Sequence, residues 1–159
     1  MKNLFDISNE IVVITGGSGQ LGIQYSKTFL DGNSFVASID LKKSKAIEEL
    51  ELKYPDSFLF IRCDLTSKES VLNASKKVKK TFGNSTVLIN NAALDSPPNA
   101  PKEETGPFEL YPEKSWDNVI DVNLKGVFNC CQVFGNIMAK NNKGSIINVS
   151  SIYGVVSPD

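Results

Sequence analysis

The sequence predicts an α/β fold with a doubly wound parallel sheet, on the basis of three observations. Short runs of β-branched and apolar residues alternate along the chain with longer segments of helical periodicity. The first run, residues 11–14, leads directly into a glycine-rich turn, and a helical pattern then begins at Leu21. Strand, glycine turn and helix in this order form the first unit of a dinucleotide-binding fold. The alternation continues to residue 149 and gives five expected strands.

Each expected strand is short, apolar and bounded by a turn signal. The second covers residues 34–39 and ends at Asp40, and the third covers residues 58–61. The fourth and fifth cover residues 86–89 and 145–149. Continuous apolar runs of this kind are typical of strands that are buried on both faces of a parallel sheet.

The helices expected between the first four strands have recognisable ends. The first covers residues 21–31 and stops at Gly32, and the second covers residues 44–54, before a proline. A capping-box spacing at residues 66–69 predicts the start of the third helix, which Gly83 closes.

Two segments separate the fourth strand from the fifth. Residues 94–111 hold four prolines and predict an irregular loop, and a loop of this length is usually functional or disordered. Residues 112–140 predict one long helix. Because its apolar residues cover nearly all sides, we expect this helix either to be buried in a large core or to pack against a partner subunit.

Composition narrows the possible functions. The chain, residues 1–159, suits one domain, and its net charge of −1 gives no broad basic face for nucleic acid. We expect no membrane span and no signal peptide, because no apolar run is long enough for either. Without histidine, and with Cys63, Cys130 and Cys131 in no metal-ligand spacing, we expect neither a metal site nor a histidine-based triad. Small buried cysteines fit a reducing cytoplasm.

The glycine turn is the candidate phosphate-binding site. Gly16 allows a tight turn, Gly19 leaves no side chain between the backbone and a pyrophosphate, and Gly22 lets the helix lie close to the sheet. The helix that follows offers free N–H groups and a partial positive charge to phosphates.

Asp40 ends the second expected strand, where a carboxylate can accept hydrogen bonds from both adenosine ribose hydroxyls and would repel a 2′-phosphate. The glycine turn holds no lysine or arginine that could receive that phosphate, although Lys42 and Lys43 follow closely. Structurally, Asp40 could simply start a turn. We expect NAD rather than NADP as the cofactor.

Six motifs, in order along the chain, resemble the short-chain dehydrogenase/reductase family. They are residues 15–22, Asp40, Asp64-Leu65, residues 90–93, residues 122–126 and residues 146–151. The resemblance covers the chain from end to end. It implies a Rossmann fold, a nicotinamide dinucleotide, and interconversion of an alcohol and a carbonyl by an Asn-Ser-Tyr-Lys constellation. The expected protein is thus an oxidoreductase with a small-molecule substrate, acting as a homo-oligomer, a dimer or tetramer.

The resemblance also implies roles for particular residues. Asn123 is expected to hold a helix kink and a water that serves the catalytic lysine, and Ser151 to donate a hydrogen bond to the substrate oxygen. The Asp64 side chain and the Leu65 backbone border the adenine, and Asn91 with Ala92 approaches the cofactor ribose. The expected cofactor-binding residues are Gly16, Ser18, Gly19, Gln20, Leu21, Asp40, Asp64, Leu65, Asn91 and Ala92.

Structural alternatives stay open at several of these positions. Asp64 fits a helix-start aspartate almost as well, and Asn123 could be a core amide that ties two backbones together. Ser150 adjoins Ser151 and could be mistaken for it.

Three departures from the family pattern bear on function. Gln20 stands where glycine is usual, so that the turn reads T-G-x-x-G-x-x-G as in the sugar-nucleotide branch, and Ala93 also replaces a usual glycine. The family's Tyr-x-x-x-Lys would lie beyond Asp159, and Tyr153 follows Ser151 too closely to be that tyrosine. We therefore expect the first part of a longer enzyme, without the last strands of the family fold and inactive alone.

Two other functions remain open. One is a non-catalytic dinucleotide-binding module, and the other is a sugar-nucleotide epimerase or dehydratase, against which residues 90–92 and 148–151 argue. Residues 151–154 and the proline-rich loop are similar to family members associated with bacterial surface-glycan pathways.

Overall fold

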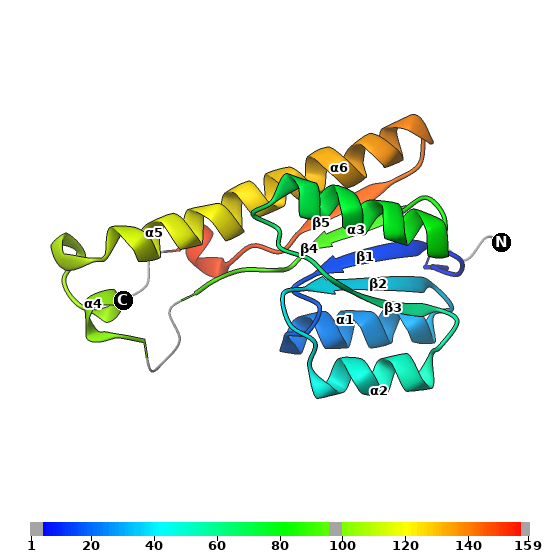
Figure 1. Cartoon of the computed structure of the whole chain (residues 1–159), viewed down its shortest axis with the longest axis horizontal. Coiled ribbons are helices and arrows are strands. Elements are labelled where there is room, and N and C mark those ends of the chain that lie inside the picture. Colours follow the sequence, from blue (N-terminus) through cyan, green and yellow to red (C-terminus); the bar gives the residue numbers. More distant parts are fainter. Residues whose placement is uncertain (1–4, 96–99, 157–159) are drawn as a thin grey trace.

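A computed structural model describes residues 5–95 and 100–156 of the chain (Figure 1). Its centre is a five-stranded sheet with the order β3-β2-β1-β4-β5, in which every pairing is parallel. The expected doubly wound parallel sheet is confirmed. The strands are β1 (Ile11–Thr15), β2 (Phe35–Asp40), β3 (Phe58–Arg62), β4 (Val87–Asn90) and β5 (Ser145–Asn148).

Strand β1 lies at the point where the strand order reverses. It pairs with β2 on one side, where Val13 lies opposite Ala37, and with β4 on the other, where Val13 lies opposite Leu88. The chain builds the sheet outward from β1 to β3 and then returns to place β4 beside β1. Such a switch point opens a crevice at the carboxyl ends of the strands.

Helices cover both faces of the sheet (Figure 1). The helices α1 (Gln20–Asp31) and α2 (Lys45–Lys53) pack on one face, and α3 (Lys68–Thr81) and α6 (Val127–Lys140) pack on the other. Alternation along β1 sends Val12 and Ile14 into the core beneath α1 and α2, and sends Val13 into the core beneath α3 and α6. None of the helices within the described residues is long and apolar enough to cross a membrane.

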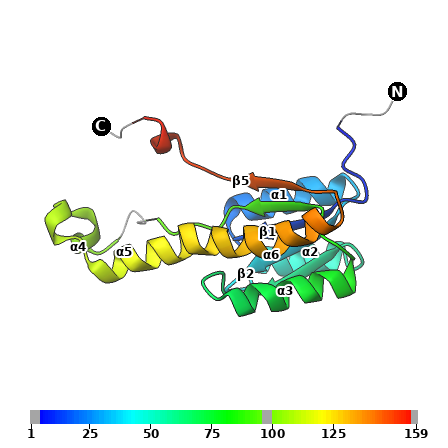
Figure 2. The same cartoon turned by 90° about the horizontal axis from the view of Figure 1, so that it is seen from above.

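The helix expected over residues 112–140 is one run of three segments. It begins with α5 (Glu113–Ile120), continues through a π-helical turn (Asp121–Gly126) and ends with α6. Both views show α5 extending past the ends of the strands, away from the sheet, with α4 (Lys102–Thr105) beyond it (Figures 1 and 2). Only the α6 part of the run therefore has a sheet to pack against.

Of the two alternatives expected for this helix, burial in the chain's own core does not hold for its outward residues. Trp116, Leu124 and Phe128 are 54%, 62% and 59% exposed, whereas Phe134 and Met138 are buried against the sheet. One face of α6 suffices to cover the strands, so the apolar residues on the other face find no partner within the described part of the chain. Packing of that face against a second subunit stays a prediction.

Two local expectations need correction. Residues 94–111 are not wholly irregular, because they hold α4 and a 3-10 turn (Phe108–Leu110), while residues 96–99 lie outside the described residues. The third helix is capped by Ser67 rather than by a box starting at Thr66, and the Ser67 hydroxyl accepts the N–H of Ser70 at 3.3 Å. The Thr66 hydroxyl instead donates to Oδ1 of Asp64 at 2.8 Å, in the loop that precedes the helix.

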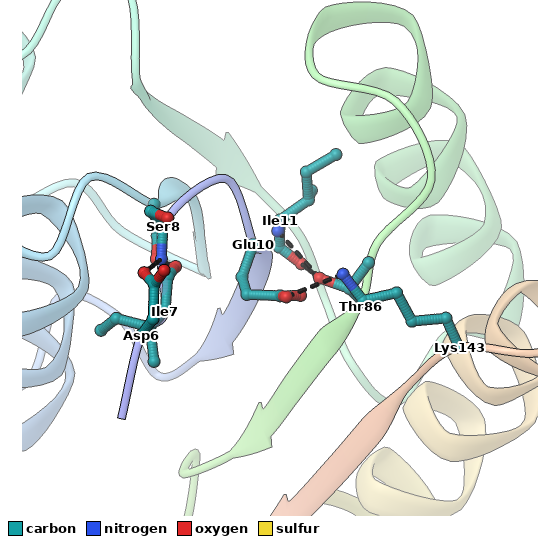
Figure 3. A network of polar contacts seen from close by, with 8 residues as sticks. Asp6, Ile7, Ser8, Glu10, Ile11, Thr86 and Lys143 are labelled. Atoms are coloured by element: carbon teal, nitrogen blue, oxygen red, sulfur yellow. Dashed lines mark hydrogen bonds and ion pairs between the residues drawn. The ribbon is translucent and has the colours of Figure 1, made fainter. Parts of the chain in front are cut away.

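Polar contacts at the amino ends of β1, β4 and β5 tie these strands together (Figure 3). Lys143 donates to the carboxylate of Glu10 at 2.7 Å, and the Thr86 hydroxyl accepts the N–H of Ile11 at 2.9 Å. Burial alone would raise the pKa of Glu10, but hydrogen bonds from Lys143 and Thr86 and the charge of Lys143 outweigh it and hold the pKa below its usual value. The network lies at the opposite end of the strands from the crevice.

Candidate functional site

A cleft of about 680 Å³ opens at the carboxyl ends of the strands. Its walls are the loops that follow β1, β2, β3 and β4, together with Val122 of the π-helical turn. Nine of the ten expected cofactor-binding residues line it, Ser18 being the exception. The expected residues that line the cleft are Gly16, Gly19, Gln20, Leu21, Asp40, Asp64, Leu65, Asn91 and Ala92.

The glycine turn is packed too tightly for side chains at Gly16, Gly17 and Gly22. Gly16 has φ +63°, and a Cβ atom there would lie 2.8 Å from Cα of Ala92. A Cβ atom at Gly22 would lie 2.5 Å from the carbonyl oxygen of Gly16. No side chain caps the N-terminus of α1, where Gly19 is the N-cap. The first-turn N–H groups of α1 are therefore available to an anion in the cleft.

Thr15 and Asn91 join the glycine turn to the loop after β4. The buried Thr15 hydroxyl accepts the N–H groups of both Asn91 and Ala92, each at 2.9 Å. In return, the Asn91 amide donates to the carbonyl oxygens of Thr15 at 3.0 Å and Gly16 at 3.2 Å. The Asn91 amide nitrogen is thus used to hold two walls of the cleft together.

Asp40 is fixed beside the glycine turn by backbone N–H groups. Its Oδ2 accepts from Ser18 at 3.0 Å and its Oδ1 from Lys42 at 3.3 Å, while the Ser18 hydroxyl donates to the carbonyl oxygen of Lys42 at 2.6 Å. Ser18 does not line the cleft itself, but its N–H helps to position Asp40, which does. Each carboxylate oxygen has a second lone pair, so Asp40 can still accept hydrogen bonds from a ligand.

Asp64 shapes the loop between β3 and α3. Its Oδ1 accepts the N–H of Thr66 at 2.9 Å and the Thr66 hydroxyl at 2.8 Å, and its own N–H donates to the hydroxyl of Ser70 at 3.0 Å. Such an Asx turn before a helix matches the structural alternative for Asp64, and the residue also lines the cleft. The two interpretations are compatible.

Asn123 lies in the π-helical turn and bonds one residue twice. Its Oδ1 accepts the N–H of Leu94 at 2.7 Å and its Nδ2 donates to the carbonyl oxygen of Leu94 at 2.9 Å. The structure shows the amide that ties two backbones, within a π-helical turn, and the role that the family resemblance implies for Asn123 stays a prediction. Single π turns inside α-helices occur frequently at functional sites.

Ser151 follows β5 and is exposed, outside the set of residues that line the cleft. The structure therefore does not bring Ser151 together with the glycine turn. Tyr153 belongs to a 3-10 turn (Ile152–Gly154) directly after it.

Asn90 is a polar residue of this region that the site prediction omits. It is buried, and its Nδ2 donates to Oδ1 of Asn148 at 2.8 Å and to the sulfur of Cys131 at 3.3 Å. Asn90 thereby links β4 to β5 and α6. The site prediction also omits seven lining residues. Five of them directly adjoin predicted residues: Ile39, Leu41, Cys63, Ala93 and Val122. The other two, Leu94 and Asp95, continue the loop after β4.

The two buried cysteines, Cys63 and Cys130, are poor nucleophiles. Burial raises the pKa of the Cys63 thiol, and burial raises the pKa of Cys130 to about 12. Both thiols are protonated at neutral pH, and the thiolate is the reactive form. Chemistry at this cleft must therefore come from other groups.

The short chain dehydrogenase family model matches residues 10–158, which is nearly the whole chain. The chain belongs to this family. Among curated short chain dehydrogenase relatives, a 3-oxoacyl-(acyl-carrier-protein) reductase FabG from Staphylococcus aureus is 33% identical over 148 residues, 91% of this chain and 56% of the relative. An NAD-dependent glycerol dehydrogenase from Listeria innocua is 26% identical over 155 residues, 98% of this chain and 58% of the relative.

Solved structures of short chain dehydrogenases share the fold. A member from Burkholderia phymatum, in complex with NAD, superposes with a TM-score of 0.84 at 22% identity, covering 98% of this chain and 53% of that one. An NAD+-bound xylitol dehydrogenase gives a TM-score of 0.83 at 24% identity, covering 96% and 56%. The chain thus spans between half and three fifths of the length of these relatives.

Proposed function

We propose that the chain binds NAD in the cleft and forms the cofactor-binding part of an oxidoreductase that interconverts an alcohol and a carbonyl. The observation that carries this proposal is the position of Asp40 beside the glycine turn, within one cleft. A carboxylate there selects a free ribose diol, and an uncapped helix N-terminus beside it suits a pyrophosphate. The NAD-dependent glycerol dehydrogenase among the relatives supports the same cofactor.

The residues present fit a dinucleotide along the whole cleft. In this proposal the first-turn N–H groups of α1 bind the pyrophosphate and Asp40 binds the adenosine ribose. Asp64 and Leu65 border the adenine, and Asn91 with Ala92 forms the wall beside the second ribose. The backbone of Ala92 lies close to the glycine turn, since a Cβ atom at Gly16 would lie 2.8 Å from the Ala92 Cα. When bound, the nicotinamide accepts or donates the hydride, and the protein contributes position and electrostatics.

Two residues of this chain are proposed to serve the reaction. Asn123 fixes Leu94, a lining residue, to the π-helical turn, and so sets the wall of the cleft beyond Asn91. Ser151 is proposed to donate a hydrogen bond to the substrate oxygen. Proton transfer in such a reaction needs a further group within hydrogen-bond reach. The family uses a Tyr-x-x-x-Lys pair for this step, and the 159 residues contain no such motif.

A second candidate, a dinucleotide-binding module without catalysis, is favoured by the position of Ser151, which lies outside the residues that line the cleft. A third candidate, a sugar-nucleotide-modifying relative, is favoured by Gln20, which takes the place of a glycine and lines the cleft. In each case we propose a homo-oligomer acting on, or binding, a small molecule in the cytoplasm, where free thiols such as Cys63 persist.

Calorimetric titration with NADH and NADPH tests the proposed cofactor. We expect NADH to bind and NADPH to bind more weakly. Titration with a nucleoside-diphosphate sugar in the same buffer separates the third candidate from the first. Equal affinities for the two dinucleotides, or no binding of either, would contradict the proposal.

A further inference from the structure

Helix α6 supplies a buried amide to the far side of the cleft. Asn129 is 4% exposed, and its Nδ2 donates to the carbonyl oxygen of Leu65 at 2.8 Å. One turn earlier, a Cβ atom at Gly126 would lie 3.1 Å from Cβ of Leu65. The start of α6 therefore lies directly against the loop that follows β3.

This bond differs from the other hydrogen bonds of the loop. The bonds among Asp64, Thr66 and Ser70 join residues at most six positions apart, so they set the shape of the loop but not its place in the fold. The Asn129 bond spans 64 positions and connects the loop to a different element. It therefore fixes where the loop lies relative to the rest of the cleft.

The same bond reaches Asp64 through one peptide group. Asn129 holds the Leu65 carbonyl oxygen, and the N–H of Thr66 on the same peptide donates to Oδ1 of Asp64. The peptide group is planar and trans, so its carbonyl and N–H cannot turn independently. The bond from Asn129 to the Leu65 carbonyl therefore also sets the direction of the Thr66 N–H, and with it the orientation of the Asp64 carboxylate that accepts it.

We propose that Asn129 is a positioning residue for the adenine end of the cleft. The inference rests on the proposed function, since it takes Asp64 and Leu65 as the adenine border. Asn129 touches no ligand, and it acts by keeping the Leu65–Thr66 peptide in the orientation that presents Asp64 and Leu65 to the base. Loss of the amide leaves a buried carbonyl oxygen without its partner, and the loop must move to regain one.

The test compares ligands that carry only one end of the dinucleotide. Asn129→Leu keeps the approximate shape of the side chain and removes the donor. We expect this variant to bind NADH and 5′-AMP about tenfold more weakly, while its affinity for reduced nicotinamide mononucleotide is unchanged. Asn136→Leu, on the exposed face of the same helix, is the matched control and is expected to bind all three ligands as the wild type does.

Nuclear magnetic resonance of the wild-type chain gives a readout that does not depend on the variant folding. Titration with 5′-AMP is expected to shift the side-chain amide resonance of Asn129 together with the backbone amide of Leu65. A wild-type chain that binds no NADH would overturn the proposed function and the inference with it. If the wild type binds NADH, two results would overturn the inference alone. One is that 5′-AMP leaves the Asn129 resonance unmoved. The other is that Asn129→Leu lowers the affinity for all three ligands equally, or for none of them.

Discussion

The carboxylate of Asp40 accepts the backbone N–H of Ser18 at 3.0 Å. This bond joins the end of β2 to the glycine turn after β1, although 22 positions separate the two residues. The proposed ribose-binding group and the proposed phosphate-binding turn therefore form one unit, in which a change at Asp40 also affects the turn.

Removing Asp40 should narrow the preference for NADH over NADPH. A carboxylate about 4 Å from a 2′-phosphate costs about 1–4 kcal/mol per charge pair between the dielectric of water and that of a protein surface. Asp40→Ala removes this repulsion and the acceptor for ribose hydroxyls, so NADH affinity should fall while NADPH affinity rises. Calorimetry on both ligands measures the change.

Asp56→Ala is the control for Asp40→Ala, because Asp56 is exposed just before β3, at the opposite end of the strands, and carries the same charge. Its affinities should match those of the wild type. If Asp40→Ala left the ratio of the two affinities unchanged, Asp40 would have no part in cofactor choice.

Gly16→Ala should destabilise the fold and abolish ligand binding. An alanine at φ +63° is strained by about 1–3 kcal/mol, and its Cβ would meet the backbone of Ala92 at 2.8 Å, a contact that cannot relax by rotating a side chain. Chemical denaturation measures the loss. Gly135→Ala, in α6, is the control: its Cβ would make an ordinary 3.4 Å contact with Ile146, so its free energy of unfolding should be unchanged or higher. If the two variants had the same free energy of unfolding, the backbone at Gly16 would not be packed as tightly as the 2.8 Å contact indicates.

The ion pair of Glu10 and Lys143 predicts a pH-dependent contribution to stability. The pKa of Glu10 is lower in the folded chain than its usual value, so the pair contributes fully above the usual glutamate pKa and is lost as the pH falls through the folded-state pKa. Lys143 is 61% exposed, which limits the contribution to about 0.2–1 kcal/mol.

Glu10→Gln should therefore lower the free energy of unfolding at neutral pH and have a smaller effect at an acid pH below the folded-state pKa of Glu10, where the wild-type side chain is protonated as well. Urea denaturation at both pH values measures this difference, with Glu49→Gln on the exposed side of α2 as the control. A loss of the same size at both pH values would show that Glu10 contributes through packing rather than through its charge.

The parts of the fold that the sequence predicts are those with a local cause. Residues 11–15 are β-branched throughout and Gly16 follows directly, so strand and turn can both be derived from adjacent residues. The reversal of strand order places β1 beside β4, and with it Thr15 beside Asn91. The position of Asp40 after the second strand follows from the residues themselves, whereas the family resemblance led to Asp64, Leu65, Asn91 and Ala92, which also line the cleft.

What the sequence misses depends on contacts between distant residues. The π-helical turn coincides with the two bonds from Asn123 to Leu94, which lie 29 positions apart, and no local pattern marks it. The Asn129–Leu65 bond has no signature for the same reason. Apolar periodicity shows that residues 112–140 are helical, but it does not show which of their apolar residues the sheet covers.

The exposed apolar face of the long helix should make a contact between subunits. Trp116, Leu124 and Phe128 present large apolar side chains on one continuous run of helix, and burial of such side chains favours association. Light scattering should show a dimer or tetramer, and Phe128→Lys should shift it toward the monomer. Leu52→Lys, at an exposed position on α2, is the control. A wild-type chain that is monomeric at micromolar concentration would refute the contact.

A polypeptide of these 159 residues should bind NADH without turning over an alcohol. Asn123 and Ser151 are present, but no Tyr-x-x-x-Lys pair follows them in the 159 residues, and a positioned acid–base group typically contributes about 10²–10⁴-fold to rate. Strand β5 is also exposed at Ile146 and Ile147, and an apolar edge strand invites pairing with other chains, so we expect weak binding and a tendency to aggregate. Intact mass, NADH titration and NADH absorbance during incubation with alcohols measure these properties. An intact mass near 17.4 kDa together with NAD-dependent alcohol oxidation would show that another residue of this chain performs the proton transfer.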